Sequence, residues 1–118
     1  MPASAASALA RAKERGHRLF ICTGRSTPEV YPRFFDLGFE GIVGGAGGYA
    51  AVGSTVLLDE RMTAEHVEAL TRMWEELGAF YVWQGPDQMG PSRGYLDFFV
   101  PRAGENPQDW VEYGESVT

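Results

Sequence analysis

The feature that most constrains the fold is a short apolar run at residues 19–22 that ends abruptly in Thr23 and Gly24. Every position of the run is apolar, which is typical of a strand covered on both faces in a parallel sheet. A helix-start signal follows at once, because Ser26 and Glu29 have the spacing of a capping box. A strand that passes so directly into a helix indicates an α/β fold.

Helical and strand patterns alternate on both sides of this junction. An alanine-rich helix is expected within residues 4–15 and ends before Gly16, a residue that suits a helix C-terminus. A second helix is expected over residues 27–37, and a short strand follows at residues 41–43. Helix, strand, helix and strand within about 45 residues predict α/β layering.

Glycine makes up 15 of the 118 residues, and six of these fall in one stretch of thirteen. Strand-like runs at residues 49–52 and 55–58 flank a Gly-Ser pair, which predicts a β-hairpin. The spacing Gly45-x-Gly47-x-x-Ala50 also matches a relaxed dinucleotide fingerprint, which requires a helix opening at Gly47. Because the pattern here is a hairpin, we expect these glycines to permit close backbone approach instead.

The second half of the sequence begins with another helix-start signal. Thr63 is expected to cap a third helix that carries an apolar stripe. Residues 79–84 and 95–100 are rich in aromatic side chains and are expected to be strands, with a loop over residues 85–94 between them. Within the later strand, Asp97 is expected on the solvent side.

Charge is distributed unevenly and marks a boundary near residue 62. Residues 1–62 carry seven basic and six acidic side chains, whereas residues 63–118 carry three and ten, for a net charge of −6. This balance supplies no positive field for nucleic acid, and no apolar run approaches the roughly 20 residues of a membrane span. A single cysteine, Cys22, excludes an internal disulfide framework and a cysteine-built zinc site, and indicates a cytoplasmic protein.

Three residues after the first strand are the best candidates for a binding site. Ligands of open α/β sheets bind beyond the carboxyl ends of the strands. Thr23 can donate its hydroxyl to a phosphoryl oxygen, Gly24 lets the backbone come close, and Arg25 can pair with an anion or brace the loop. The alternative is a plain strand-to-helix turn in which Thr23 and Ser26 only cap the helix.

Taken in order, these features resemble the haloacid dehalogenase superfamily, and more closely its Cof-type phosphatase branch with a large cap. The resemblance rests on the helix ending at residues 14–16, the strand ending in Thr-Gly-Arg, the Leu-Gly at residues 37–38 and the glycine-rich hairpin over residues 41–60. It implies a partial Rossmann-like core over residues 1–62, followed by part of an α+β cap over residues 63–118.

This resemblance implies a magnesium-dependent phosphohydrolase that acts on a small phosphorylated metabolite. In that family one aspartate attacks the phosphorus and a second acts as general acid and base, while the strand-end threonine, here Thr23, binds the phosphoryl group. The cap of such enzymes closes over the substrate. Four residues are therefore possible substrate contacts: Gly47, Gly48, Trp83 and Arg93.

Several residues of the family pattern have no counterpart here. The paired aspartates, Asp-x-Asp, occur nowhere in the sequence, the only lysine is Lys13, and the late cluster of metal-binding acids is missing. The Asn-Gly-Ala that often precedes the hairpin reads Ala46-Gly47-Gly48. We therefore expect a fragment without nucleophile or bound metal, inactive in isolation and associating with itself through exposed core edges. The alternative is a non-catalytic binding or interaction module with an α/β fold.

Overall fold

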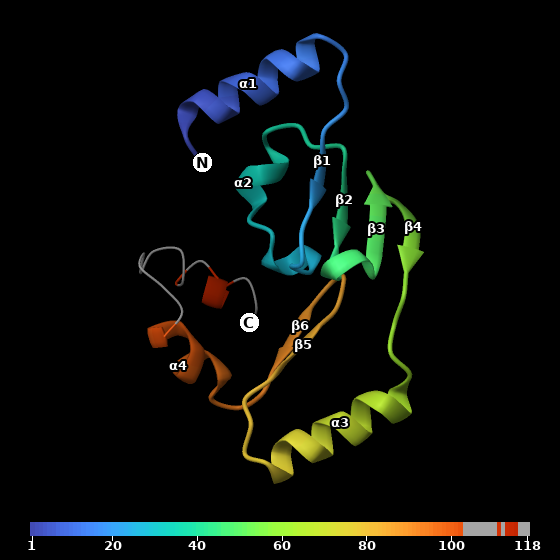
Figure 1. Ribbon diagram of the computed structural model, residues 1–118, viewed down its shortest axis with the longest axis vertical. Coiled ribbons are helices and arrows are strands. Elements are labelled where there is room, and N and C mark those ends of the chain that lie inside the picture. Colours follow the sequence, from blue (N-terminus) through green and yellow to red (C-terminus); the bar gives the residue numbers. More distant parts are fainter. Residues whose placement is uncertain (103–110, 112, 116–118) are drawn as a thin grey trace.

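The computed structural model describes residues 1–102, 111 and 113–115, and it contains a four-stranded sheet and a separate two-stranded ribbon (Figure 1). The strands of the sheet lie side by side in the order β1 (Phe20–Cys22), β2 (Gly41–Gly44), β3 (Tyr49–Val52) and β4 (Thr55–Asp59). β1 and β2 are parallel, and the remaining pairs are antiparallel. The predicted α/β class is confirmed.

Helices lie around this sheet without enclosing it. They are α1 (Ala3–Glu14), α2 (Pro32–Phe35), α3 (Ala64–Glu76) and α4 (Tyr95–Phe99), with single 3₁₀ turns η1 (Thr27–Glu29), η2 (Gly45–Gly47) and η3 (Val100–Arg102). In Figure 1, α1 lies beyond one end of the sheet. The ribbon, formed by β5 (Val82–Gln84) and β6 (Met89–Pro91), lies with α3 at the opposite end, toward which β1 and β2 run.

The core of the sheet is small and centred on β2 and β3. Ile42 and Ala51 are 5% and 8% exposed and face each other across the antiparallel pair. The radius of gyration is 16.7 Å, whereas a compact domain of this length would have about 13–14 Å. Much of the apolar surface of the elements is therefore open to solvent.

The first predicted helix, the parallel strands and the hairpin are confirmed. α1 ends before Gly16, whose φ of +84° is the left-handed conformation expected after a helix. The Gly-Ser pair joins β3 to β4, and Gly53 there has a φ of +55°. α3 is also confirmed, because the Thr63 side chain accepts a hydrogen bond from the N–H of His66 at 3.3 Å.

The second helix is shorter than predicted. The capping pair forms, but the chain makes only η1 before Val30 and Tyr31 adopt extended conformations, with ψ values of 114° and 135°. Tyr31 precedes Pro32, and the proline ring disfavours helical geometry in the residue before it. The sequence therefore restarts as the four-residue α2 instead of continuing as one helix.

The prediction that the first strand is covered on both faces is wrong for the described residues. Phe20 is 43% exposed, and Cys22 is exposed as well. Among the strands that the structure describes, β1 lies at the edge of the sheet and pairs only with β2. Its apolar composition thus creates an open apolar surface at this edge of the sheet.

The secondary structure predicted after α3 is partly wrong. The first aromatic run contains β5, but its partner β6 lies inside the segment expected to be a loop. Residues 95–100 form α4 and the start of η3, so Asp97 lies on a helix, where it is exposed. Tyr95 and Phe99 explain the difference, because aromatic rings four residues apart meet on a helix and stack here with centroids 5.3 Å apart.

No helix among the described residues is long and apolar enough to cross a membrane. The second region expected over residues 63–118 reaches beyond the described residues, because 103–110, 112 and 116–118 lie outside them.

Candidate functional site

The loop after β1 holds the three residues predicted to bind phosphate. Thr23 prolongs the parallel pairing, because its N–H donates to the carbonyl of Val43 at 2.9 Å. Its Oγ1 accepts from the N–H of Arg25 at 3.1 Å, so the hydroxyl proton can still be donated to a ligand. Gly24 is exposed, and a Cβ added there would meet no atom within 4 Å. The loop therefore offers a hydroxyl and an open backbone at the carboxyl end of β1.

Arg25 braces this loop. Its Nη1 donates to the backbone carbonyl of Glu29 at 3.2 Å, and its guanidinium lies 5.4 Å from the centre of the buried Tyr31 ring. Both contacts hold the guanidinium against η1. Of the two roles foreseen for Arg25, bracing is the one that these contacts supply.

The glycine-rich turn lies directly against this loop. The N–H of Gly45 donates to the carbonyl of Arg25 at 2.8 Å, and a Cβ on Gly44 would come within 3.0 Å of the same oxygen. The predicted close backbone approach is confirmed at this point. No helix opens at Gly47, because η2 is a single turn and β3 follows it. The geometry that a dinucleotide fingerprint needs is absent from this described segment.

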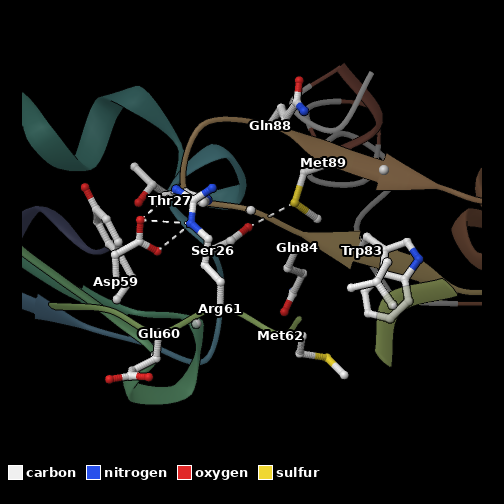
Figure 2. Close-up of a pocket in the computed structure, with 17 residues that line it drawn as sticks. Ser26, Thr27, Asp59, Glu60, Arg61, Met62, Trp83, Gln84, Gln88 and Met89 are labelled. Carbon is white, nitrogen blue, oxygen red and sulfur yellow. Dashed lines mark hydrogen bonds and ion pairs between the residues drawn. The ribbon is translucent and has the colours of Figure 1, made fainter. Parts of the chain in front are cut away.

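A pocket of about 570 Å³ opens beside these loops, between the sheet and the ribbon (Figure 2). One wall comes from η1 and the end of β4, and the other from β5 and the segment leading into β6. Besides the residues labelled in Figure 2, the glycine-rich turn contributes Gly45, Gly48 and Tyr49. Polar groups and large apolar side chains thus share one cavity, as is typical of sites for small molecules.

An ion pair occupies the sheet side of the pocket. The guanidinium of Arg61 donates to both carboxylate oxygens of Asp59 at 2.6–2.9 Å. These hydrogen bonds lower the pKa of Asp59. Close by, Oγ1 of Thr27 is buried and has no hydrogen-bond partner among the described residues. The pocket therefore holds one hydroxyl whose hydrogen-bonding capacity is unused.

The predicted substrate contacts divide into two groups. Gly48 and Trp83 line the pocket, and the indole Nε1 of Trp83 donates to Oγ1 of Thr71 at 3.1 Å. Gly47 is exposed in η2, and Arg93 is exposed between β6 and α4, and neither lines this pocket.

Two residues of the pocket were missed from the sequence: Asp59 and Arg61. They follow the hairpin, and their alternate spacing places them on one side of an extended chain. That spacing was a usable signal. Gln84 lies in the aromatic run expected over residues 79–84 and lines the pocket, although the pairing of β5 with β6 that places it was not predicted.

A resident metal ion would need acidic or imidazole side chains gathered around one point. Within the part of the chain that the structure describes, no three His, Cys, Asp or Glu residues are grouped to hold an ion. Mg²⁺ requires near-octahedral oxygen ligands, of which protein carboxylates commonly supply one or two. The described residues do not form such a set.

Comparison with known proteins places the chain in a family. Residues 1–94 match the haloacid dehalogenase-like hydrolases. A hypothetical protein from Geobacillus kaustophilus HTA426 is similar in structure, with 29% identity and a TM-score of 0.67. That match covers 75% of this chain and 35% of the other. No curated protein matches the sequence.

Two solved phosphatases share the fold at lower identity. The HAD subclass IIB sugar phosphatase BT4131 has 24% identity and a TM-score of 0.67 over 84% of this chain and 40% of its own. BT1666 from Bacteroides thetaiotaomicron, a phosphatase of the haloalkanoate superfamily, has 19% identity and a TM-score of 0.56 over 70% and 30%. The chain thus spans less than half the length of each of these structures. On the match over residues 1–94, the chain belongs to the haloacid dehalogenase-like hydrolases.

Proposed function

We propose that this chain supplies the phosphate-binding and substrate-facing part of a phosphohydrolase for a small phosphorylated metabolite. The observation that carries the proposal is the placement of the Thr23–Arg25 loop at the carboxyl end of β1, next to a pocket of about 570 Å³. Ser26 and Thr27, which continue that loop, line the pocket. Thr23, Gly24 and Arg25 do not line the pocket themselves. In this proposal, the organic part of a phosphate bound at the loop extends past Ser26 and Thr27 into the pocket.

Each residue has a defined part in this proposal. The Thr23 hydroxyl donates to a phosphoryl oxygen, and Gly24 exposes its backbone to the same group. Gly48 and Trp83 contact the organic part, and the aromatic face of Trp83 suits the apolar side of a small ring or chain. Gly47 and Arg93 do not line the pocket, and their role as substrate contacts stays a prediction.

The test is a titration of inorganic phosphate into the ¹⁵N-labelled chain. We expect saturable shifts of the Thr23, Gly24 and Arg25 amides, and Thr23→Val should weaken them at least tenfold, because valine keeps the shape but removes the donor. Thr55→Val, on the exposed strand β4, is the matched control and should leave them unchanged. Equal affinity in Thr23→Val and the wild type would refute the proposed phosphate site.

Turnover is a separate question from binding. In this family, magnesium and a nucleophilic aspartate carry the phosphoryl transfer, and the sequence contains no Asp-x-Asp pair. We propose that the 118-residue chain by itself hydrolyses no phosphate ester. A phosphatase assay with Mg²⁺ is expected to give the rate of buffer alone, and a normal enzymatic rate would overturn this point.

A non-catalytic binding module is the second candidate. The observation that favours it is the lack of any grouped metal ligands within the described residues. In such a module the Thr23 loop is only a structural turn, so phosphate would leave its amides unmoved. The same titration therefore separates the two candidates.

We also propose that the chain associates with itself in the cytoplasm. β4 is exposed along its whole length, and its Val56 and Leu57 are 52% and 66% exposed at a free sheet edge. Unpaired apolar edges favour pairing with another strand. Light scattering should show oligomers that Leu57→Lys reduces, and a monomer at high concentration would contradict the proposal.

A further inference from the structure

The least expected group in this open molecule is a buried carboxylate. Glu29 is 4% exposed and Ser26 beside it is 5% exposed. Burial of a charged group is unfavourable unless hydrogen bonds compensate for the lost water. A carboxylate buried more deeply than any side chain of the sheet core therefore needs a structural reason.

The hydrogen bonds of the Glu29 carboxylate come from the strand-end loop, from β5 and from Tyr113. The N–H and the hydroxyl of Ser26 both donate to its Oε2 at 2.9 Å. The same oxygen accepts from Nε2 of Gln84, on β5, at 2.6 Å. Sδ of Met89, on β6, lies 2.9 Å from the Ser26 hydroxyl (Figure 2). The carboxylate oxygen thus joins the strand-end loop to β5, and the Ser26 hydroxyl joins the same loop to β6.

Glu29 is also linked to the residues proposed to bind phosphate. Its backbone carbonyl accepts from the Arg25 guanidinium at 3.2 Å, and the N–H of Arg25 donates to Oγ1 of Thr23 at 3.1 Å. These contacts connect the Glu29 carbonyl, Arg25 and Thr23 in one continuous path. A shift of Glu29 would displace Arg25 and would change the geometry at the Thr23 hydroxyl.

We propose that Glu29 is a positioning residue whose buried carboxylate fixes the Thr23–Arg25 loop against the β5–β6 ribbon through Gln84. The proposal rests on the proposed function, because it assumes that this loop is where phosphate binds. Glu29 itself touches no phosphate. It fixes the positions of the two walls of the pocket relative to each other. Phosphate binding at the loop therefore depends on a contact with Gln84, which lies 55 residues away in the sequence.

An exchange of the two partners tests this contact. In Glu29→Gln, the new amide faces the amide of Gln84, and in Gln84→Glu two carboxylates face each other. In the double variant, the amide introduced at position 29 can donate to the carboxylate introduced at position 84 and can still accept from Ser26. We expect each single variant to weaken phosphate binding about tenfold and to speed hydrogen exchange of the Ser26 amide, as loss of a hydrogen bond to a charged group would.

Rescue by the double variant is the deciding result. We expect it to restore both measurements to within about threefold of the wild type, as coupled partners do. Single variants that match the wild type, or a double variant no better than the singles, would overturn the proposal. Glu68→Gln, on the exposed face of α3, is the matched control and should change neither measurement.

Two arrangements keep the test decisive. If Glu29→Gln does not fold, Gln84→Met decides, because it leaves the Ser26 contacts intact and removes only the hydrogen bond from Gln84 to the carboxylate. Unchanged phosphate affinity in Gln84→Met would then overturn the proposal. If the wild type does not bind phosphate, the proposed function fails. Hydrogen exchange of the Ser26 amide, measured in the two single variants and the double variant, still decides whether Glu29 joins the loop to the ribbon.

Discussion

Different interactions stabilise the four-stranded sheet and the region around the β5–β6 ribbon. In the sheet, neighbouring strands pair through their backbones, and glycines let those backbones come close. Around the ribbon, aromatic rings make the contacts. The ring centre of Trp74, on α3, lies 5.2 Å from that of Tyr81 and 5.1 Å from that of Trp83. The rings of Phe80 and Phe98 stack with their centres 4.6 Å apart.

This difference assigns different roles to the two regions. Backbone pairing fixes atoms closely, which suits a loop that must present a hydroxyl and N–H groups to a phosphate. Aromatic contacts depend less on orientation and offer apolar surface, which suits the recognition of an organic group. If this difference is real, a destabilising substitution in the sheet should lower the stability of the whole chain. A destabilising substitution in the aromatic cluster should lower the stability of that region alone.

The largest effect is expected for Gly41→Ala, in the centre of the sheet. A Cβ at this position would overlap the carbonyl oxygen of Ala51 and would lie 3.0 Å from the Phe20 ring. Since the carbonyl belongs to the paired strand β3, it cannot move without disturbing the sheet, and we expect a loss of about 2–3 kcal/mol in unfolding free energy. Urea denaturation measures this loss. Gly24→Ala, where a Cβ meets no atom within 4 Å, is the control and should cost little.

The next effect is expected for Trp74→Ala, in the aromatic cluster. Trp74 is half-buried, so the loss should be about 2 kcal/mol, less than for a fully buried tryptophan. Hydrogen exchange should speed up in α3 and β5 but not at Ile42 or Ala51. Equally faster hydrogen exchange at those two sheet residues would contradict the difference between the two regions, because they would then unfold as one unit. Leu77→Ala, at a side chain that is 72% exposed directly after the same helix, should change neither region.

The same contrast explains how far the sequence could be interpreted. α1, the parallel strands, the hairpin and α3 were predictable because their signals are local, as in the Gly-Ser pair and the cap at Thr63. The position of the Thr23 loop at a strand end followed from the same signals. Proline and glycine supplied most of these boundaries, since they act through their own backbone conformation.

Predictions failed where contacts between side chains, and not backbone signals, decide the structure. Residues 95–100 have the composition of a strand, but Tyr95 and Phe99 stack on a helix, and Met89 pairs with Gln84 instead. Strand propensity is largely a statement about side-chain surroundings, which the sequence alone does not supply. The Glu29–Gln84 contact spans 55 residues and was missed for the same reason.

A smaller effect, of opposite sign, is expected for Ala46→Gly. Among the described residues, Ala46 is the one non-glycine residue with positive φ, at +54°. The left-handed conformation costs a residue with a Cβ about 1–2 kcal/mol, and glycine avoids this cost while losing more backbone entropy on folding. The unfolding free energy should therefore rise by about 0.5–1 kcal/mol. Ala50→Gly, in the neighbouring strand, should lower it, and a loss in Ala46→Gly would show that the turn differs in solution.

The smallest effect concerns the exposed ion pair at the end of the sheet. The hydrogen bonds from Arg61, and then its charge, lower the pKa of Asp59 below the ordinary value of 3.8. A lowered pKa means that the pair stabilises the fold above pH 3.8 and that this contribution is lost as the pH falls through the folded-state pKa.

Carboxyl ¹³C shifts recorded against pH measure the pKa of Asp59 directly. Arg61→Gln should raise it, and Arg61→Lys should give an intermediate value, because lysine keeps the charge but cannot form the two-pronged contact. Since the pair is exposed, added salt should also narrow the difference between wild type and Arg61→Gln. Identical titrations in all three proteins would mean that the pair does not form in solution. The sheet side of the pocket would then present a guanidinium that is not engaged by Asp59, and an anionic substrate would be favoured there over a neutral one.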